Sequence, residues 1–183
     1  LGIAVMPLIT APTGDSNAYL GWGVASVEGR LIMDYRFGDK VLSRFINCII
    51  ESGQKATAQR VVDDAMDNIE EKLTKETAPE KPENSLSLFR MAIENVKPFV
   101  EVRSKRIGGA NYQVPMQVNH KRQQSLAFRW LIEACRSEKG RPMANRLADE
   151  LYAAAKKEGK AMMTRDQTHK MAEANRAFAH FAN

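Results

Sequence analysis

Apolar positions recur at helical spacing over most of the chain beyond residue 38. One run covers residues 39–50, a second covers 55–73, and a third starts at the cap Asn84 or Ser85 and stops before Pro98. In each run the large apolar residues fall three or four positions apart, which places them on one face of a helix. A polar side chain caps a helix start, and a proline disfavours helix in the residue before it. The first half of the chain therefore predicts three amphipathic helices.

Helical spacing returns in the second half of the chain. A fourth helix is predicted from about Gln123, and Pro142 suits the first turn of a fifth helix, which ends at Gly159. Thr164, with Gln167 three residues later, fits a capping box for the last helix. This last helix is expected to bury three side chains, those of Met171, Ala174 and Phe178.

Between these two groups of helices the pattern changes to alternation of apolar and polar residues. The alternating runs, 99–105 and 111–118, flank Gly108 and Gly109, a combination that is typical of a β-hairpin. Pro115 has no amide hydrogen for a strand ladder, so we expect it on an outward edge. An isolated hairpin is only marginally stable in water. We therefore expect a hairpin at about 99–118 that protrudes from the helical body and is steadied by what it binds.

The predicted fold class is mainly α, with a six-helix bundle-like body and the protruding β-hairpin. Residues 1–35 hold prolines and glycines without a sustained period, so we interpret them as an N-terminal arm that packs on a partner, with a partly ordered tail as the alternative. Residues 36–183 form the helical domain. A chain of 183 residues suits one domain with an arm. No apolar stretch approaches the roughly 20 residues that a membrane span needs, so no membrane partner is expected.

Positive charge is concentrated in one part of the sequence. The whole chain carries a net charge of +5, yet residues 97–146 hold eleven Lys and Arg against three Asp and Glu, a net charge of +8. Residues 41–96 hold seven against ten, a net charge of −3. A solvated surface would mix the two signs more evenly. The asymmetry favours a nucleic-acid-binding surface over a plain basic face.

Side chains suited to catalysis or metal binding are few and scattered. Cys48 and Cys135 lie in apolar runs, where a buried inert thiol is favoured over a nucleophile, and no histidine lies at metal-ligand spacing from them. Asp63 and Asp64 fit an exposed helix face. Gly108–Gly109 lacks the rest of a phosphate loop, so it fits a turn, or a close approach of the backbone to a phosphate. We expect no enzyme activity, no metal and no cofactor.

The hairpin offers side chains suited to RNA. Arg103, Lys105 and Arg106 place three cations near the turn, where each phosphate contact would release counterions. Tyr112 adds a stacking face and Gln113 adds an amide, although Tyr112 fits a cross-strand packing partner equally well.

Two predicted helices extend this set. Arg122 and Arg129 lie seven residues apart on the fourth helix, so they share one face about two turns apart, and Arg136 extends the row. The last helix adds residues on its polar side. The candidate RNA-binding residues are Arg103, Lys105, Arg106, Gly108, Gly109, Tyr112, Gln113, Lys121, Arg122, Arg129, Arg136, Lys170, Asn175 and Arg176.

Four ordered strings stand out in the second half of the chain. They are Val-Glu-Val-Arg-Ser-Lys-Arg-Ile-Gly-Gly-Ala-Asn-Tyr-Gln-Val-Pro at 100–115, Leu-Ala-Phe-Arg-Trp at 126–130, Arg-Leu-Ala-Asp-Glu-Leu at 146–151 and His-Lys-Met-Ala-Glu-Ala-Asn-Arg-Ala-Phe-Ala-His-Phe at 169–181. Together these strings resemble the small-subunit ribosomal protein seven family, of the bacterial and organellar type. The likeness extends from about Phe37 to the C-terminus.

The resemblance implies a helical body with a protruding hairpin, in agreement with the periodicity. It also implies a structural constituent of the small ribosomal subunit that binds the 3′ major domain of the small-subunit rRNA and nucleates assembly of the subunit head. By matching position, the hairpin would be Arg103 to Gln113 and would line the tRNA exit site near the mRNA. Neighbouring ribosomal proteins of the head and platform would be further partners. A free-standing architectural RNA-binding protein, which would share the basic hairpin, is the alternative.

Two features depart from the family pattern. Family members usually open with a short basic arm, whereas the first 29 residues here contain no Lys or Arg, which favours protein contact for the arm. The loop at 75–84 is long and acidic, and we expect it to face solvent or a neighbouring protein. The first residue, Leu1, and the N-terminal extension favour a mitochondrial protein that has lost a targeting segment. A bacterial cytoplasmic protein or a plastid protein is the alternative.

Overall fold

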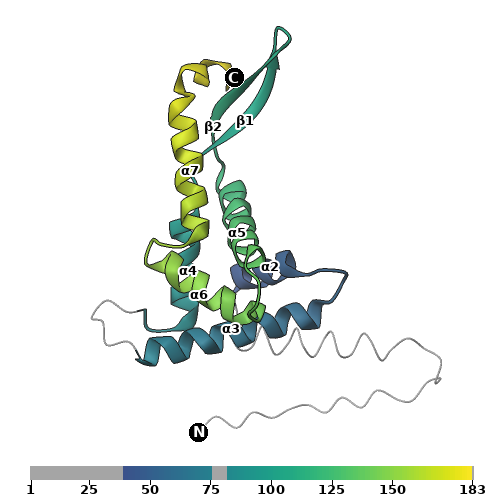
Figure 1. Ribbon diagram of the computed structural model, residues 1–183, viewed down its shortest axis with the longest axis vertical. Coiled ribbons are helices and arrows are strands. Elements are labelled where there is room, and N and C mark those ends of the chain that lie inside the picture. Colours follow the sequence, from purple (N-terminus) through teal and green to yellow (C-terminus); the bar gives the residue numbers. More distant parts are fainter. Residues whose placement is uncertain (1–38, 76–81, 183) are drawn as a thin grey trace, which may run out of the picture. The chain divides into compact units, whose positions relative to one another are not determined.

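The computed structural model describes residues 39–75 and 82–182, which form six α-helices, one β-hairpin and one 3-10 helix (Figure 1). The predicted arm at 1–35 and residues 76–81 of the predicted loop lie outside the described residues. The mainly α class with a two-stranded hairpin is confirmed. In chain order the elements are α2 (Lys40–Ile49), α3 (Lys55–Lys75), α4 (Ser85–Val96), β1 (Val100–Ile107), β2 (Ala110–Gln117), α5 (His120–Ser137), α6 (Met143–Ala155), α7 (Lys160–Ala174) and η1 (Arg176–Ala182).

Three phenylalanines from three helices meet in the core. The ring of Phe45 on α2 lies edge-on to Phe89 on α4 and to Phe128 on α5, with centroids 5.4 and 5.2 Å apart. Edge-to-face pairs of this kind stabilise a core beyond the area that they bury. Leu147 and Leu151 of α6 are fully buried, and α6 contacts α3, α4, α5 and α7. The apolar faces read from the sequence thus form one core.

Asp39 joins the start of α2 to α4. Its Oδ1 accepts a hydrogen bond of 2.6 Å from the backbone N–H of Val41, which caps the helix. Its Oδ2 accepts a hydrogen bond of 2.7 Å from Nε of Arg90. The carboxylate is buried, and these two donors compensate the cost of removing it from water.

The hairpin turn forms at the predicted glycines. Gly108 and Gly109 have φ of +57° and +91°, the left-handed values that a two-residue type I′ turn requires. The strands pair from Val100 opposite Gln117 to Ile107 opposite Ala110. Hydrogen-bonded and non-hydrogen-bonded pairs alternate from the turn, so Pro115, opposite Val102, falls at a non-hydrogen-bonded pair. This position agrees with the predicted outward edge.

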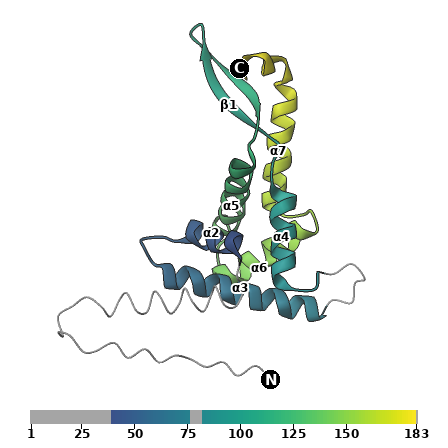
Figure 2. The same cartoon turned by 180° about the vertical axis from the view of Figure 1, so that it is seen from behind.

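The hairpin is supported by the chain's own C-terminal segment. β1 contacts α7 and β2 contacts η1, and the two views show the hairpin beside these elements and beyond the helical core (Figures 1 and 2). The ring of Tyr112 lies 5.2 Å from that of Phe178 and 5.7 Å from that of Phe181, centroid to centroid. The sequence predicted a hairpin steadied by what it binds. The structure instead shows intramolecular support, because η1 folds back onto β2.

Several predicted helix boundaries are wrong by a few residues. α5 begins at His120, three residues before the predicted Gln123, and Pro142 is the N-cap of α6 and not part of its first turn. α7 begins at Lys160 after the N-cap Gly159. Thr164 therefore lies inside α7, where its hydroxyl donates to the carbonyl of Lys160 at 3.0 Å, and the predicted capping box does not form.

The predicted burial of the last helix is also wrong. Met171 is 53% exposed and Ala174 is exposed, while Phe178 lies in η1 and is half-buried. Ala172 is the buried residue in this part of α7. The end of α7 lies beside the hairpin and not in the helical core, so its apolar periodicity does not report burial.

Of the two cysteines, Cys135 is buried as predicted, whereas Cys48 is exposed. Cys48 directly precedes the buried Ile49, and one position along a helix turns a side chain by about 100°, which takes it out of the core. Burial raises the pKa of the Cys135 thiol to about 12, and partial desolvation raises the pKa of the more exposed Cys48 thiol. Both thiols therefore stay protonated near neutral pH, as the expectation of inert cysteines requires.

Candidate nucleic-acid interface

The candidate residues fall on three neighbouring elements. The hairpin holds those from Arg103 to Gln113, α5 holds those from Lys121 to Arg136, and the junction of α7 with η1 holds Lys170, Asn175 and Arg176. α5 begins three residues after β2 ends, so its cations continue from the base of the hairpin. Arg122 and Arg136 are fourteen residues apart, which is about 21 Å along a helix.

The hairpin has two different sides, because directly opposed residues of an antiparallel pair point to the same side and successive pairs alternate. One side, called the C-terminal side because it faces the C-terminal segment of the chain, holds Glu101, Arg103, Lys105, Ile107, Ala110, Tyr112, Val114 and Met116. The open side holds Val100, Val102, Ser104, Arg106, Asn111, Gln113, Pro115 and Gln117. Val114 is 1% exposed and Tyr112 packs on η1, which shows that the C-terminal side is the covered one.

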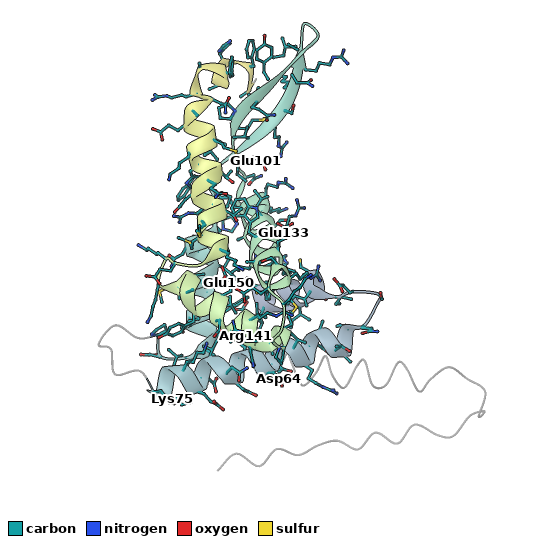
Figure 3. All side chains as sticks on the ribbon, in the orientation of Figure 1. Asp64, Lys75, Glu101, Glu133, Arg141 and Glu150 are labelled. Atoms are coloured by element: carbon teal, nitrogen blue, oxygen red, sulfur yellow. The ribbon has the colours of Figure 1, made fainter. Side chains whose placement is uncertain are left out.

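A buried carboxylate holds two of the candidate arginines at the base of the hairpin. Glu101, labelled in Figure 3, is 7% exposed. Its Oε1 accepts a hydrogen bond of 2.5 Å from Nε of Arg103 on the same strand. Its Oε2 accepts a hydrogen bond of 3.2 Å from Nε of Arg122 on α5. Both arginine side chains remain about half exposed, so each presents further N–H groups to solvent.

Sequence reasoning missed Glu101 as a member of this site. One signal was present, since Glu101 is the single acidic residue between Lys97 and Arg129. An isolated carboxylate among cations is a natural partner for arginine. The sequence did not show which arginines it meets, because Arg122 lies on another element, 21 residues along the chain.

The remaining hairpin candidates differ in whether their side chains contact other residues of the chain. Nζ of Lys105 donates a hydrogen bond of 2.8 Å to the carbonyl of Phe181. Tyr112 is half-buried against the rings of η1, so the packing interpretation of this residue describes the structure. Arg106 and Gln113 are exposed, and neither side chain bonds to another residue in the described part of the chain.

On α5, the three candidates that do not contact Glu101 also differ in whether they have partners within the described residues. Arg136 donates from Nη2 to the carbonyl of Ile49 at 3.3 Å and pairs with Glu51 at 2.8 Å, which joins the end of α5 to the end of α2 and the segment after it. Lys121 and Arg129 are exposed, and among residues 39–75 and 82–182 they have no hydrogen-bond or ion-pair partner. These two cations are therefore available to an external anion.

At the C-terminal end of α7, Asn175 is the C-cap, and its Nδ2 donates to the carbonyl of Met171 at 2.8 Å. Lys170 and Arg176 are exposed. At the hairpin turn, a Cβ added to Gly108 or Gly109 would meet no atom within 4 Å. The positive φ values, and not crowding, therefore account for glycine in the turn, and the open backbone leaves room for a close approach by another molecule.

Two further properties concern the described residues alone. Within them, no three His, Cys, Asp or Glu side chains are grouped as a metal ion would require. None of the helices in this part of the chain combines the length and apolar character needed to cross a bilayer.

The sequence of this chain is similar to a known protein family and to several known proteins. The profile of a family described as Ribosomal protein S7p/S5e matches residues 24–176. A protein of Rhodopirellula baltica named small ribosomal subunit protein uS7 is 54% identical over 159 residues, which cover 87% of this chain and 98% of that protein. The proteins of the same name from Methylobacterium radiotolerans and Thermotoga maritima are 47% and 48% identical, over 85% and 79% of this chain and 96% and 88% of theirs.

Proposed function

The chain belongs to the ribosomal protein S7p/S5e family, and from this premise we propose that it binds the 3′ major domain of the small-subunit rRNA and nucleates assembly of the subunit head. The family named from the four sequence strings is confirmed. The chain is a structural, non-enzymatic protein of the small ribosomal subunit, with rRNA and other ribosomal proteins as its partners.

The observation that carries the rRNA proposal is a set of exposed cations without protein partners. Arg106, Lys121 and Arg129 lie on the hairpin and α5, in the region whose net charge is +8, and none is paired with another described residue. A cation that is not neutralised within the protein is free to replace counterions on phosphate. Arg103 and Arg122 add partly exposed guanidinium groups that Glu101 holds in place.

We extend the proposal to the hairpin, which lines the tRNA exit site near the mRNA. Its position beyond the helical core and its exposed turn supports this role (Figure 1). In the same proposal, residues 1–35 form an arm distinct from the rRNA-binding domain at 36–183, and this arm contacts protein of the head or platform. The absence of Lys and Arg from the first 29 residues supports protein contact.

The comparisons give no support to a mitochondrial location, because the relatives described above are bacterial proteins. We therefore propose that the chain belongs to the small subunit of a bacterial ribosome, in line with the bacterial alternative that the sequence left open.

Sedimentation tests the proposal. The full chain is mixed with small subunits reconstituted without their own S7-family protein and centrifuged through a gradient. We expect it to migrate with the subunit and to protect a transcript of the 3′ major domain, but not a transcript of the 5′ domain. A chain that stays at the top of the gradient, or binds both transcripts equally, would instead be the free-standing architectural RNA-binding protein.

A further inference from the structure

Several side chains on the C-terminal side of the hairpin contact other residues of the same chain. Tyr112 packs on Phe178 and Phe181, Nζ of Lys105 donates to the carbonyl of Phe181, and Arg103 is bonded to Glu101. These contacts use side chains that the sequence had grouped with the RNA-binding residues. The geometry therefore divides that group into side chains that already contact other residues of the chain, on this side, and side chains that have no partner in the described part of the chain, on the other side.

The open side presents a row of polar side chains that the fold does not use. Ser104 lies opposite Gln113, and Arg106 lies opposite Asn111, so the four side chains form two adjacent cross-strand pairs next to the turn. All four are exposed. None of these side chains forms a hydrogen bond or ion pair with another residue in the described part of the chain.

The chemistry of this row differs from that of α5. It offers one guanidinium, two amides and one hydroxyl. Amide and hydroxyl groups both donate and accept hydrogen bonds, which suits base edges and the 2′-hydroxyl of ribose. The salt-sensitive attraction to phosphate relies instead on cations, of which these four residues include one.

We propose that the open side of the hairpin is its RNA-contacting surface, and that Ser104, Arg106, Asn111 and Gln113 bind unpaired nucleotides of one RNA strand mainly through hydrogen bonds to base edges and ribose hydroxyls. The proposal rests on the proposed function, since it assigns the side and the mode of contact within it. The packing of Tyr112 on η1 covers part of the other side of the ribbon, so the open side is the side that offers a strand a continuous row of polar groups that are unpaired within the described residues. In this proposal the open side of the hairpin contacts the bases and riboses of the RNA, and the cations of α5 supply the salt-sensitive attraction.

The matched substitutions Arg106→Gln and Lys105→Gln test the assignment of sides. Each removes one positive charge from adjacent positions of β1, so the two variants lose similar long-range attraction to RNA. Only Arg106 lies on the open side. We expect Arg106→Gln to weaken RNA binding about three- to tenfold more than Lys105→Gln, which corresponds to the loss of one hydrogen-bonded contact. Equal losses, or a greater loss for Lys105→Gln, would overturn the proposal.

A neutral double variant, Asn111→Ala with Gln113→Ala, tests the mode of contact. It should weaken binding about tenfold or more while leaving the slope of log K against log salt unchanged, because no charge is removed. Unchanged affinity, or a changed slope, would contradict contact through neutral hydrogen bonds.

Two titrations on the full chain identify the RNA source. One uses the isolated chain with a 3′ major domain transcript, and the other uses deacylated tRNA with reconstituted subunits that carry the chain and mRNA. An effect of the open-side variants in either titration supports the proposal, and no effect in both overturns it. The wild-type chain is the control for the proposed function. If the proposed function were wrong, the wild-type chain would neither bind the transcript nor enter the subunit. If only the assignment of the open side were wrong, the wild-type chain would do both.

Discussion

Glu101 shows how a single acidic residue can serve a basic surface. A buried carboxylate is costly unless charged donors compensate it, and here Arg103 and Arg122 supply them from β1 and α5. The pair of contacts fixes the base of the hairpin to the start of α5. It also limits the freedom of two arginines that face outward, so less conformational entropy is lost if they bind RNA.

We predict that Glu101→Gln destabilises the fold by about 1–2 kcal/mol, because the neutral amide loses the ion pairing with both half-exposed guanidinium groups and keeps only one acceptor oxygen for them. Urea denaturation measures this difference. Glu94→Gln is the matched control, since Glu94 is 71% exposed and pairs only with Lys97, the C-cap of α4, among the described residues. If both variants lost the same stability, Glu101 would be no more than a surface ion pair.

His169 links α7 to the residue before β1. The backbone N–H of Phe99 donates to Nε2 of His169 at 3.3 Å, and the two rings stack with centroids 6.2 Å apart. This bond requires an unprotonated Nε2. Burial is the main cause that lowers the pKa of His169 below its usual 6.5, and the nearby Arg165 lowers it further, while Asp166 acts in the opposite direction.

A lowered pKa in the folded state gives a definite sign to the pH dependence of stability. The unfolded chain takes up a proton on His169 at higher pH than the folded chain, so the unfolding free energy falls as the pH drops below 6.5. We predict that His169→Gln reduces this fall between pH 7 and pH 5 in denaturation curves. The exposed His180→Gln serves as the control, and an equal reduction in both variants would contradict the assignment to His169.

At the scale of elements, the hairpin and η1 form one supporting unit. The rings of Tyr112, Phe178 and Phe181 contact one another, and Phe178 and Phe181 stack 6.5 Å apart. An isolated two-stranded hairpin is marginal in water, so the ordered state of this one depends on the aromatic contacts. The helical core does not include these rings, since every residue of η1 is at least partly exposed.

We therefore predict that Phe178→Ala with Phe181→Ala loosens the hairpin alone. Amide hydrogen exchange in β1 and β2 should speed up by an amount that corresponds to about 1–3 kcal/mol, while exchange in α3 and α6 stays as it was. Phe99→Ala is the control, because its ring is 74% exposed and lies outside this cluster. Unchanged exchange in the strands would show that the aromatic contacts do not support the hairpin.

The sequence predicted most elements because their signals are local. The residues that form each apolar face from α2 to α6, and the two glycines of the turn, lie close together in the sequence. The predicted burial at the end of the chain was wrong for a physical reason. Phe178 is half-buried against Tyr112, which lies 66 positions earlier, and periodicity carries no information on such a contact. The side of the hairpin that is covered depends on the same contact, so the sequence could not divide its candidate residues.

At the scale of the whole described region, the net positive charge is concentrated on the hairpin and α5. Figure 3 labels Asp64 on α3, at the end of the helical core away from the hairpin, and Glu101 at the base of the hairpin. α3 carries five acidic and four basic residues, whereas the hairpin and α5 together carry seven basic and two acidic residues. Such an asymmetry favours an orientation in which the hairpin and α5 face a polyanion.

Function was predictable from the sequence at the level of the family and of the polyanion partner, because ordered strings and net charge are local properties. Individual contacts were not. The structure shows that Arg136 pairs with Glu51 and that Arg103 and Arg122 share Glu101, whereas Lys121 and Arg129 are unpaired within the described residues. These partners come from other elements, so residue type alone could not rank the candidate cations.

The central claim is that the basic region formed by the hairpin and α5 binds rRNA through phosphate contacts, and a salt titration tests it most directly. The full chain is titrated against a 3′ major domain transcript at several salt concentrations. We predict a log–log slope of several units, since each phosphate contact contributes about −0.7 to −0.9, and a decrease of about 1.4 to 1.8 in its magnitude for Lys121→Gln with Arg129→Gln. A slope near zero, or one that this double variant leaves unchanged, would contradict the account.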